Sequence, residues 1–219
     1  MNDELLKEFA EIVGPEGITG DVVSPADEAS LVVVAGVCHQ HGVPISVTSS
    51  APATTPAGTP ERGGVILSVH RLADIQVAAA GLAVRAGAGA TVARVRSAVA
   101  EPKLVVVGLG AETGSVHVGT LVARGEVPRR SMSGVEAVLS NGDAVKAGGA
   151  ALKDVVGYDL IAVLLGSAGR LAVISAVTFR LEPAAGRTAT SKPPGTRSWQ
   201  PGLAGAFDPK GLLRSGASR

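Results

Sequence analysis

The stretch from Gly148 to Pro183 constrains the fold of this 219-residue chain more than any other segment. Its sequence, GGAALKDVVGYDLIAVLLGSAGRLAVISAVTFRLEP, contains two glycine-bearing turns that frame a short helix and lead into a long alternating strand, Val173 to Leu181. Gly157, Gly166 and Gly169 permit left-handed backbone and a close approach of main-chain N–H groups to a ligand. Two interpretations are open: a pair of ordinary tight turns, or a backbone shaped to lie against a flat, phosphate-bearing cofactor.

Composition limits both the core and the class of protein. Hydrophobic residues make up 46% of the chain but aromatic residues only 2%, so alanine, valine and leucine must build the core, which favours strands. The net charge of +1 and the lack of a Lys/Arg cluster argue against nucleic-acid binding. The only cysteine, Cys38, excludes an internal disulfide and fits a reducing compartment, so we expect a cytoplasmic protein. No His, Cys, Asp or Glu group has metal-ligand spacing.

The N-terminal third predicts a small βαβ unit after an amphipathic helix. The opening MNDELLKEFAEIVG has neither the basic start nor the long apolar run of a signal peptide, and no apolar run is long enough to span a bilayer. Val22 and Val23 predict a short strand, and Asp27 with Pro25 predicts the start of a helix that ends near Gly42. Residues 45–47 then predict a strand parallel to the first.

The remaining elements predict a second, mostly antiparallel sheet. Further strands are expected at residues 65–69, 75–79, 82–86 and 104–107, with a helix capped by Thr91 that runs through Ala100. Asn141 and Gly142 separate two strand patterns, which predicts a hairpin with a type I′ turn. The fold class is therefore α+β: a small parallel βαβ subdomain plus a larger mixed sheet with flanking helices.

The segment from Gly148 to Pro183 resembles the end of the FAD-binding domain of the vanillyl-alcohol oxidase/PCMH flavoprotein family. The family pattern GG-x-x-x-K-[ND]-V-x-G-Y-D-L followed by G-S-x-G-x-L-x-V-I-[ST] is matched from Gly148 to Ser175. The most similar members are FAD-binding subunits of glycolate oxidase. The resemblance covers roughly Gly20 to Pro183 and implies a PCMH-type fold with FAD between the two subdomains.

The loop expected to hold the cofactor pyrophosphate departs from the family. In family members, the segment after the second strand resembles R-G-G-G-[TS]-S. This chain has Thr48-Ser49-Ser50-Ala51-Pro52 at that place. Hydroxyls can still donate to phosphate oxygens, but proline has no N–H and alanine resists positive φ. Loss of two charge-assisted hydrogen bonds would weaken binding by about two to four orders of magnitude. A remodelled phosphate loop and a solvated surface loop both remain open.

A second flavin-contacting segment is better preserved. Gly114 to Ala123 resembles the family's G-A-T-[VI]-G-G-x-[VI]-A stretch, and residues 127–130 resemble its G-P-R-R continuation. The resemblance implies a short helix whose N-terminal amides lie against the isoalloxazine and ribityl chain. Together the matches assign cofactor contacts to the following residues: Thr48, Ser49, Ser50, Gly114, Ser115, Val118, Gly119, Thr120, Gly157, Tyr158, Gly166, Ser167, Gly169, Leu171 and Ile174.

The C-terminal part resembles the F-D-P-x-G-x-[LF]-N-P-G ending of family members, but no cap domain separates it from the FAD-binding domain. We therefore expect four parts: an N-terminal helix (1–19), the FAD-binding domain (20–183), a flexible linker in place of the cap (184–203) and a C-terminal tail (204–219). No catalytic residue is assigned. His117 lies in a flavin-contacting motif, either as a catalytic group or as a polar rim residue.

The resemblance implies an oxidoreductase that transfers hydride from a 2-hydroxy acid to non-covalent FAD, with a second flavoprotein and an iron–sulfur subunit as partners. Non-covalent attachment is expected because the loop from Thr48 to Thr55 has neither histidine nor cysteine. The alternative is a non-catalytic, cap-less descendant that serves as an assembly module.

Overall fold

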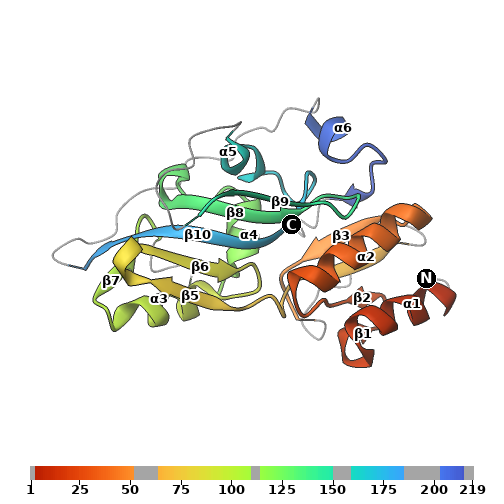
Figure 1. The fold of residues 1–219 in the computed structure, drawn as a ribbon, viewed down its shortest axis with the longest axis horizontal. Coiled ribbons are helices and arrows are strands. Elements are labelled where there is room, and N and C mark those ends of the chain that lie inside the picture. The colour runs from red at the N-terminus through yellow and green to blue at the C-terminus, as the bar shows by residue number, and fades with distance from the viewer. Residues whose placement is uncertain (1–2, 52–63, 110–113, 150–158, 185–202, 215–219) are drawn as a thin grey trace.

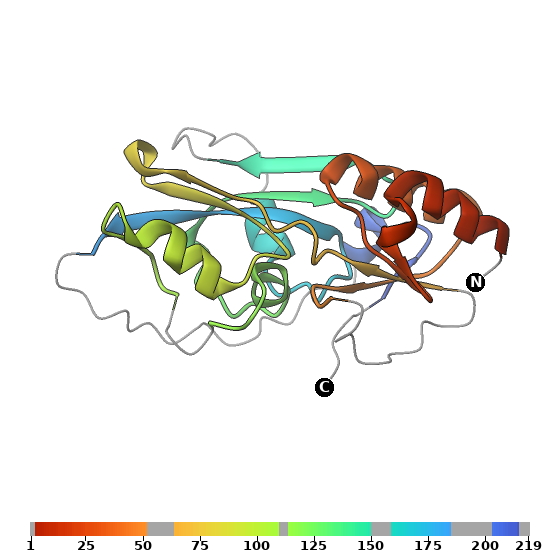
Figure 2. The ribbon, with the colours of Figure 1, turned by 90° about the horizontal axis from the view of Figure 1, so that it is seen from below.

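The structure is a computed structural model that describes residues 3–51, 64–109, 114–149, 159–184 and 203–214. Two sheets lie side by side, each with helices on one face (Figures 1 and 2). Gly157, Tyr158, most of the loop after Ala51 and most of the predicted linker lie outside the described residues. Within the described ranges, every helix is too short or too polar to span a bilayer.

The first sheet has five strands in the order β1-β2-β4-β3-β11. β1 (Ile18–Thr19) pairs antiparallel with β2 (Val22–Val23), whereas β4 (Val65–Ser68) pairs parallel with both β2 and β3 (Ile45–Thr48). The predicted βαβ unit is confirmed, since β2 and β3 are parallel, but β4 lies between them. The N–H and C=O groups of a strand point to both of its edges, and with β2 and β3 on either side β4 pairs both sets.

Helices α1 (Asp3–Val13) and α2 (Glu28–His41) cover this sheet on one face (Figure 2), with the 3-10 turn η1 (Pro15–Gly17) after α1. The expected start of α2 is confirmed, because the Asp27 side chain accepts a hydrogen bond from the Ser30 N–H in a capping box. The expected end is also confirmed, because Gly42 adopts φ +66° and ends the helix in the left-handed conformation.

The C-terminal tail joins the first sheet. α6 (Ala204–Phe207) precedes β11 (Leu213–Arg214), which pairs parallel with β3 at the sheet edge. The Ile45 N–H donates to the Leu212 carbonyl at 2.7 Å, and the Leu213 N–H donates to the buried Asp208 carboxylate at 2.7 Å. The tail therefore completes the edge of the first sheet.

The second sheet runs β5-β6-β10-β8-β9, and β7 pairs with the far end of β10. All these pairings are antiparallel. The bounds are β5 (Ile75–Ala78), η3 (Ala79–Gly81), β6 (Ala83–Gly87), α3 (Val92–Ala100), β7 (Leu104–Val106), α4 (Val118–Ala123), η5 (Arg129–Ser131), β8 (Met132–Val138), β9 (Ala144–Gly148), α5 (Leu160–Leu164) and β10 (Val173–Pro183). α3 and α4 pack against it.

The hairpin between β8 and β9 is confirmed, but the predicted type I′ turn is wrong. A type I′ turn needs positive φ at both central residues, and among these only Gly142 has it, at +91°. The Asn141 side chain instead accepts a hydrogen bond from the Asp143 N–H at 3.0 Å. An Asx interaction of this kind stabilises a turn in which only the glycine is left-handed.

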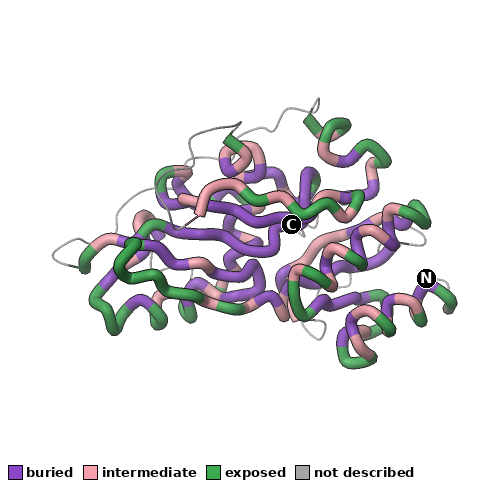
Figure 3. The backbone as a smooth tube through the Cα atoms, in the orientation of Figure 1, coloured by how far each residue is buried: buried purple, intermediate pink, exposed green. Residues whose placement is uncertain are grey.

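β10 is the centre of the core (Figure 3). It lies between β6 and β8, and its residues from Val173 to Phe179 are all buried. The long strand that the alternating pattern predicts is confirmed. Burial of both faces arises because α4 packs on one side, while charged side chains of the neighbouring strands cover Ala176 and Thr178 on the other.

Candidate cofactor site

The carboxyl ends of the parallel strands β3 and β4 carry a group of hydroxyl side chains. The Ser50 N–H donates to the Thr48 hydroxyl at 3.2 Å, and the Ser68 hydroxyl at the end of β4 donates to the Ser50 carbonyl at 2.6 Å. Ser49 is buried, with 7% of its surface exposed. In open α/β sheets, ligands bind outside this end of the strands, so the position agrees with a phosphate loop.

The backbone of residues 87–91 links these strand ends to α4. The Val118 N–H donates to the Ala90 carbonyl and the Gly119 N–H to the Ala88 carbonyl, both at 2.8 Å. A Cβ placed on Gly119 would lie 3.0 Å from the Ser49 hydroxyl oxygen, so Ser49 packs directly over the start of α4. The phosphate loop and the second predicted flavin segment are therefore brought together.

These bonds correct one expectation. The resemblance implied that the N-terminal amides of α4 lie against the flavin, but the amides of Val118 and Gly119 are engaged within the protein. Val118 itself is fully buried. Gly114, Ser115 and Thr120 keep exposed or partly exposed surface at the same end of the helix.

The third predicted segment follows α5 and packs against the end of α4. The Gly166 N–H donates to the Val122 carbonyl at 3.0 Å, and the Ala168 N–H to the Ala123 carbonyl at 2.9 Å. Gly166 and Gly169 have positive φ, as the sequence predicts, but their turn is built into the protein rather than open to a ligand.

The predicted contacts in this segment are buried. Leu171 is fully buried and Ile174 is 6% exposed, both within the core. Ser167 is also fully buried, and its hydroxyl has no hydrogen-bond partner within the described part of the chain. Ser131 and Ser140 share that property elsewhere, so the Ser167 hydroxyl alone does not indicate a ligand.

Two histidines belong to the site, and the sequence pattern placed only one of them there. His70 follows β4, and its Nδ1 lies 3.0 Å from the Ser68 hydroxyl. His117 is the N-terminal cap residue of α4, makes no side-chain cap hydrogen bond and forms a β-bridge with Thr91. The signal for His70 was its place directly after a parallel strand. We call Thr48, Ser49, Ser50, Ser68, His70 and His117 the hydroxyl–imidazole cluster.

The surroundings favour the neutral form of both imidazoles. Burial, helped by the Arg71 charge and by His117, lowers the pKa of His70 below its usual value. Burial also lowers the pKa of His117. Neutral imidazoles can donate or accept one hydrogen bond at each ring nitrogen, so the cluster offers adaptable polar partners.

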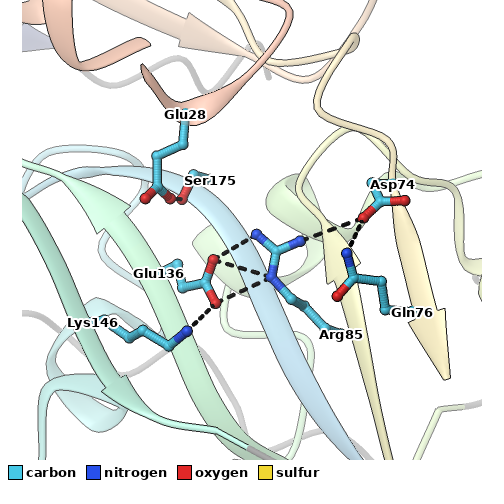
Figure 4. Close-up of polar contacts among 7 residues, drawn as sticks. All are labelled: Glu28, Asp74, Gln76, Arg85, Glu136, Lys146 and Ser175. Atoms are coloured by element: carbon cyan, nitrogen blue, oxygen red, sulfur yellow. Dashed lines mark hydrogen bonds and ion pairs between the residues drawn. The ribbon is translucent and has the colours of Figure 1, made fainter. Parts of the chain in front are cut away.

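A cavity of about 210 Å³ lies between the N-terminus of α2 and the second sheet. Its lining includes Asp27, Glu28, Asp74, Arg71 and Arg85. The Glu28 carboxylate accepts a hydrogen bond from Ser175 on β10 (Figure 4). Three carboxylates repel phosphate, so a helix N-terminus that would otherwise attract an anion does not suit one here.

Both arginines of this cavity are already paired. Arg71 donates to the Ser24 carbonyl at 3.2 Å and lies 3.5 Å from Glu16. Arg85 binds both carboxylate oxygens of Glu136, and Lys146 lies 2.9 Å from the same carboxylate (Figure 4). This row of charges across the sheet is a structural contact rather than a site for phosphate.

The Glu136→Gln substitution is expected to lower the free energy of unfolding at pH 7 by about 2 kcal/mol, because it removes the carboxylate that binds the Arg85 guanidinium in two hydrogen bonds. Arg85 holds the pKa of Glu136 below its usual value despite burial. The stabilisation is therefore present above the unfolded pKa, about 4.3, and is lost as pH falls through the folded pKa. Urea unfolding at several pH values tests this, with Glu101→Gln as an exposed control. A pH-independent difference would contradict it.

Other chemistry receives no support from the described residues. Cys38 is buried in α2, and burial raises the pKa of its thiol to about 12, which makes it unreactive. Within the ranges that the structure describes, no group of three or more His, Cys, Asp or Glu side chains is placed to hold a metal.

Comparison with known proteins agrees with the fold. The family model described as FAD binding domain matches residues 21–148. Because this match covers more than half of the chain, the chain belongs to that family. Among solved structures, an alkyldihydroxyacetonephosphate synthase has a TM-score of 0.68 at 12% identity and covers 84% of this chain and 41% of its own. The predicted PCMH-type fold is confirmed.

Two curated relatives extend the comparison. A D-lactate dehydrogenase of Archaeoglobus fulgidus is 27% identical over 172 residues, which are 74% of this chain and 38% of the relative. The glycolate oxidase subunit GlcD of Bacillus subtilis is 26% identical over 172 residues, 74% of this chain and 37% of the relative. The chain thus spans well under half of each relative's length.

The residues present fit FAD through their side chains rather than through main-chain amides. Hydroxyl and imidazole groups of the cluster are suitable partners for phosphate oxygens. The amides of Val118 and Gly119 are not, because they already donate to carbonyls. Ser49 packs over Gly119, so a bound cofactor must lie beside that contact or displace the serine side chain.

Proposed function

We propose that this chain is the FAD-binding domain of an oxidoreductase that oxidises a 2-hydroxy acid. The observation that carries this proposal is the meeting of Thr48–Ser50 with the start of α4, at the carboxyl ends of parallel strands. Family membership supports FAD as the cofactor. The two relatives named as D-lactate dehydrogenase and glycolate oxidase subunit support a 2-hydroxy acid as the substrate.

Bound FAD would supply the hydride acceptor, while the protein supplies binding, orientation and a base. We propose that Thr48, Ser49 and Ser50 lie at the phosphates and that Gly114, Ser115 and Thr120 lie nearer the flavin ring. Gly157 and Tyr158 are proposed neighbours that lie outside the described residues. No described residue is assigned as the base.

We further propose that the substrate-binding groups lie outside this FAD-binding domain, in the part of the two relatives that the chain does not match, since it spans 38% and 37% of them. A second flavoprotein subunit and an iron–sulfur subunit are the proposed partners. A free, buried cysteine supports a reducing, cytoplasmic compartment. We propose non-covalent FAD, because the thiol of Cys38 is inaccessible.

One observation favours a second candidate, a non-catalytic assembly module. The α4 amides are satisfied internally, and Ser49 occupies the space above Gly119. When the protein itself satisfies the groups that would contact a cofactor, fewer groups remain to bind FAD. This candidate predicts that the chain is indifferent to FAD.

The two candidates are separated by a binding experiment. We expect quenching of FAD fluorescence on titration with the purified chain, with a dissociation constant on the order of micromolar, because a nanomolar flavin site weakened about a thousandfold reaches that range. Acid precipitation should release all the flavin into the supernatant. A chain that leaves FAD fluorescence unchanged at about 100 µM protein would contradict the proposal and favour the assembly module.

A further inference from the structure

Two residues of the hydroxyl–imidazole cluster, His70 and His117, lie on either side of one backbone segment. A Cβ added to Gly89 would overlap the carbonyl groups of Val69 and His70, so residue 89 lies directly against the His70 backbone. On its other side the same segment pairs with α4, through the Thr91–His117 bridge and the bond from Val118 to Ala90. His70 and His117 thus flank a single intervening strand of backbone.

Hydrogen bonding fixes the tautomer of His70. The Ser68 hydroxyl has one proton, which it donates to the Ser50 carbonyl at 2.6 Å. Its contact with Nδ1 of His70 at 3.0 Å therefore requires the proton on Nδ1. Nε2 of neutral His70 is left as an acceptor that becomes a donor when the ring takes up a proton. Tautomer selection by a neighbouring group is typical of functional histidines.

The described segments that adjoin the pair offer it no compensating anion. The strand end Thr48–Ser50, the segment 87–91 and α4 carry no acidic residue. Arg71, beside His70, directs its guanidinium to Val13, Ser24 and Glu16. Within the described residues, the imidazole of His117 makes no hydrogen bond to the protein. It lies close enough to His70 to lower the pKa of that residue. A negatively charged group between the two rings would favour their protonated forms.

We propose that His70 and His117 bind the phosphate groups of the dinucleotide, taking up protons as it binds. This inference rests on the proposed function. It explains how the chain holds a pyrophosphate without the glycine loop of its family and with the α4 amides already engaged. The charged hydrogen bonds of the imidazolium groups replace those that main-chain N–H groups make elsewhere. Both histidines bind the cofactor and take no part in hydride transfer.

The test is isothermal titration calorimetry of FAD in two buffers of different ionisation enthalpy at pH 7.5. Net proton uptake is expected with the wild-type chain. His70→Asn retains a donor for Ser68 but lacks Nε2, and His117→Ala lacks the second ring. Each is expected to weaken FAD binding about tenfold to a hundredfold and to reduce proton uptake. Riboflavin, which has no phosphate, should bind both variants as it binds the wild type.

The exposed His41, at the far end of α2 beside Glu8, provides the matched control, and His41→Gln should bind FAD normally. Circular dichroism melting must show that all the variants fold. If FAD binds without proton uptake and both variants bind like wild type, the histidine proposal is overturned while the proposed function stands. If the wild-type chain does not bind FAD, both the histidine proposal and the proposed function are overturned.

Discussion

Replacing Gly89 with alanine is expected to lower the free energy of unfolding by about 3 kcal/mol. The added Cβ would overlap the carbonyl oxygens of Val69 and His70 and would lie 2.6 Å from the His70 carbonyl carbon. Backbone groups cannot turn aside as a side chain does, so the segments on either side of residue 89 must separate. For a chain of this size the melting temperature should fall by roughly 6 to 12 °C.

Gly36 is the matched control for this substitution. It lies within α2, and nothing is within 4 Å of a Cβ placed there. Gly36→Ala should therefore leave stability unchanged or raise it by up to about 1 kcal/mol through helix propensity. Melting followed by circular dichroism measures both. Equal melting temperatures for Gly89→Ala and the wild type would show that segment 87–91 is not packed as described.

Replacing Phe179 with alanine is expected to cost about 3 to 5 kcal/mol. Phe179 is fully buried in β10, where it lies opposite Val84 of β6 and Met132 of β8. Only 2% of the chain is aromatic, and the surrounding core is built from smaller side chains that cannot expand to fill the cavity. The loss is a large fraction of the roughly 5 to 15 kcal/mol typical of a domain.

Urea unfolding gives this value directly. Val77 of the edge strand β5 is 36% exposed, and Val77→Ala should cost less than about 0.5 kcal/mol. A loss below about 1 kcal/mol for Phe179→Ala would contradict the central position of β10. An unchanged urea m-value in the variant would indicate that only stability, and not the extent of unfolding, has changed.

Much of the fold was predictable because local chemistry determined it. Asp27 and Thr91 cap helices through their own side chains, Gly42 ends one, and the hairpin follows from two strand patterns around Gly142. These signals depend on residues close together in sequence. The same reasoning failed on the turn type, because the Asn141 side chain accepts a hydrogen bond from the Asp143 N–H and Asn141 does not adopt positive φ.

The order of the strands and the burial of β10 were beyond local reasoning. Insertion of β4 between β2 and β3 depends on pairing between distant segments, and the closure of the sheet edge by β11 depends on a strand about 165 residues further along the chain. One face of β10 is covered by Arg85 and Glu136, and no sequence pattern predicts that these two residues pair.

The site was predicted in part. The resemblance predicted cofactor contacts for both Thr48–Ser50 and Gly119, and the structure places Ser49 against Gly119. The sequence did not indicate His70 as a site residue, because its contacts with Ser68 and His117 arise only in the fold. The hydrogen bonds of the α4 amides also depend on the carbonyls of Ala88 and Ala90, which lie about thirty residues away in sequence.

The most direct test of the cofactor's position is a titration of the ¹⁵N-labelled chain with FAD, followed by backbone amide chemical shifts. We expect the largest changes at Thr48–Ser50, His70 and Ser115–Thr120. We also expect little change at Asp27, Glu28 and Asp74 around the acidic cavity. Shifts centred on that cavity, or no shifts with FAD at millimolar concentration, would contradict the claim that the cofactor lies at the carboxyl ends of β3 and β4.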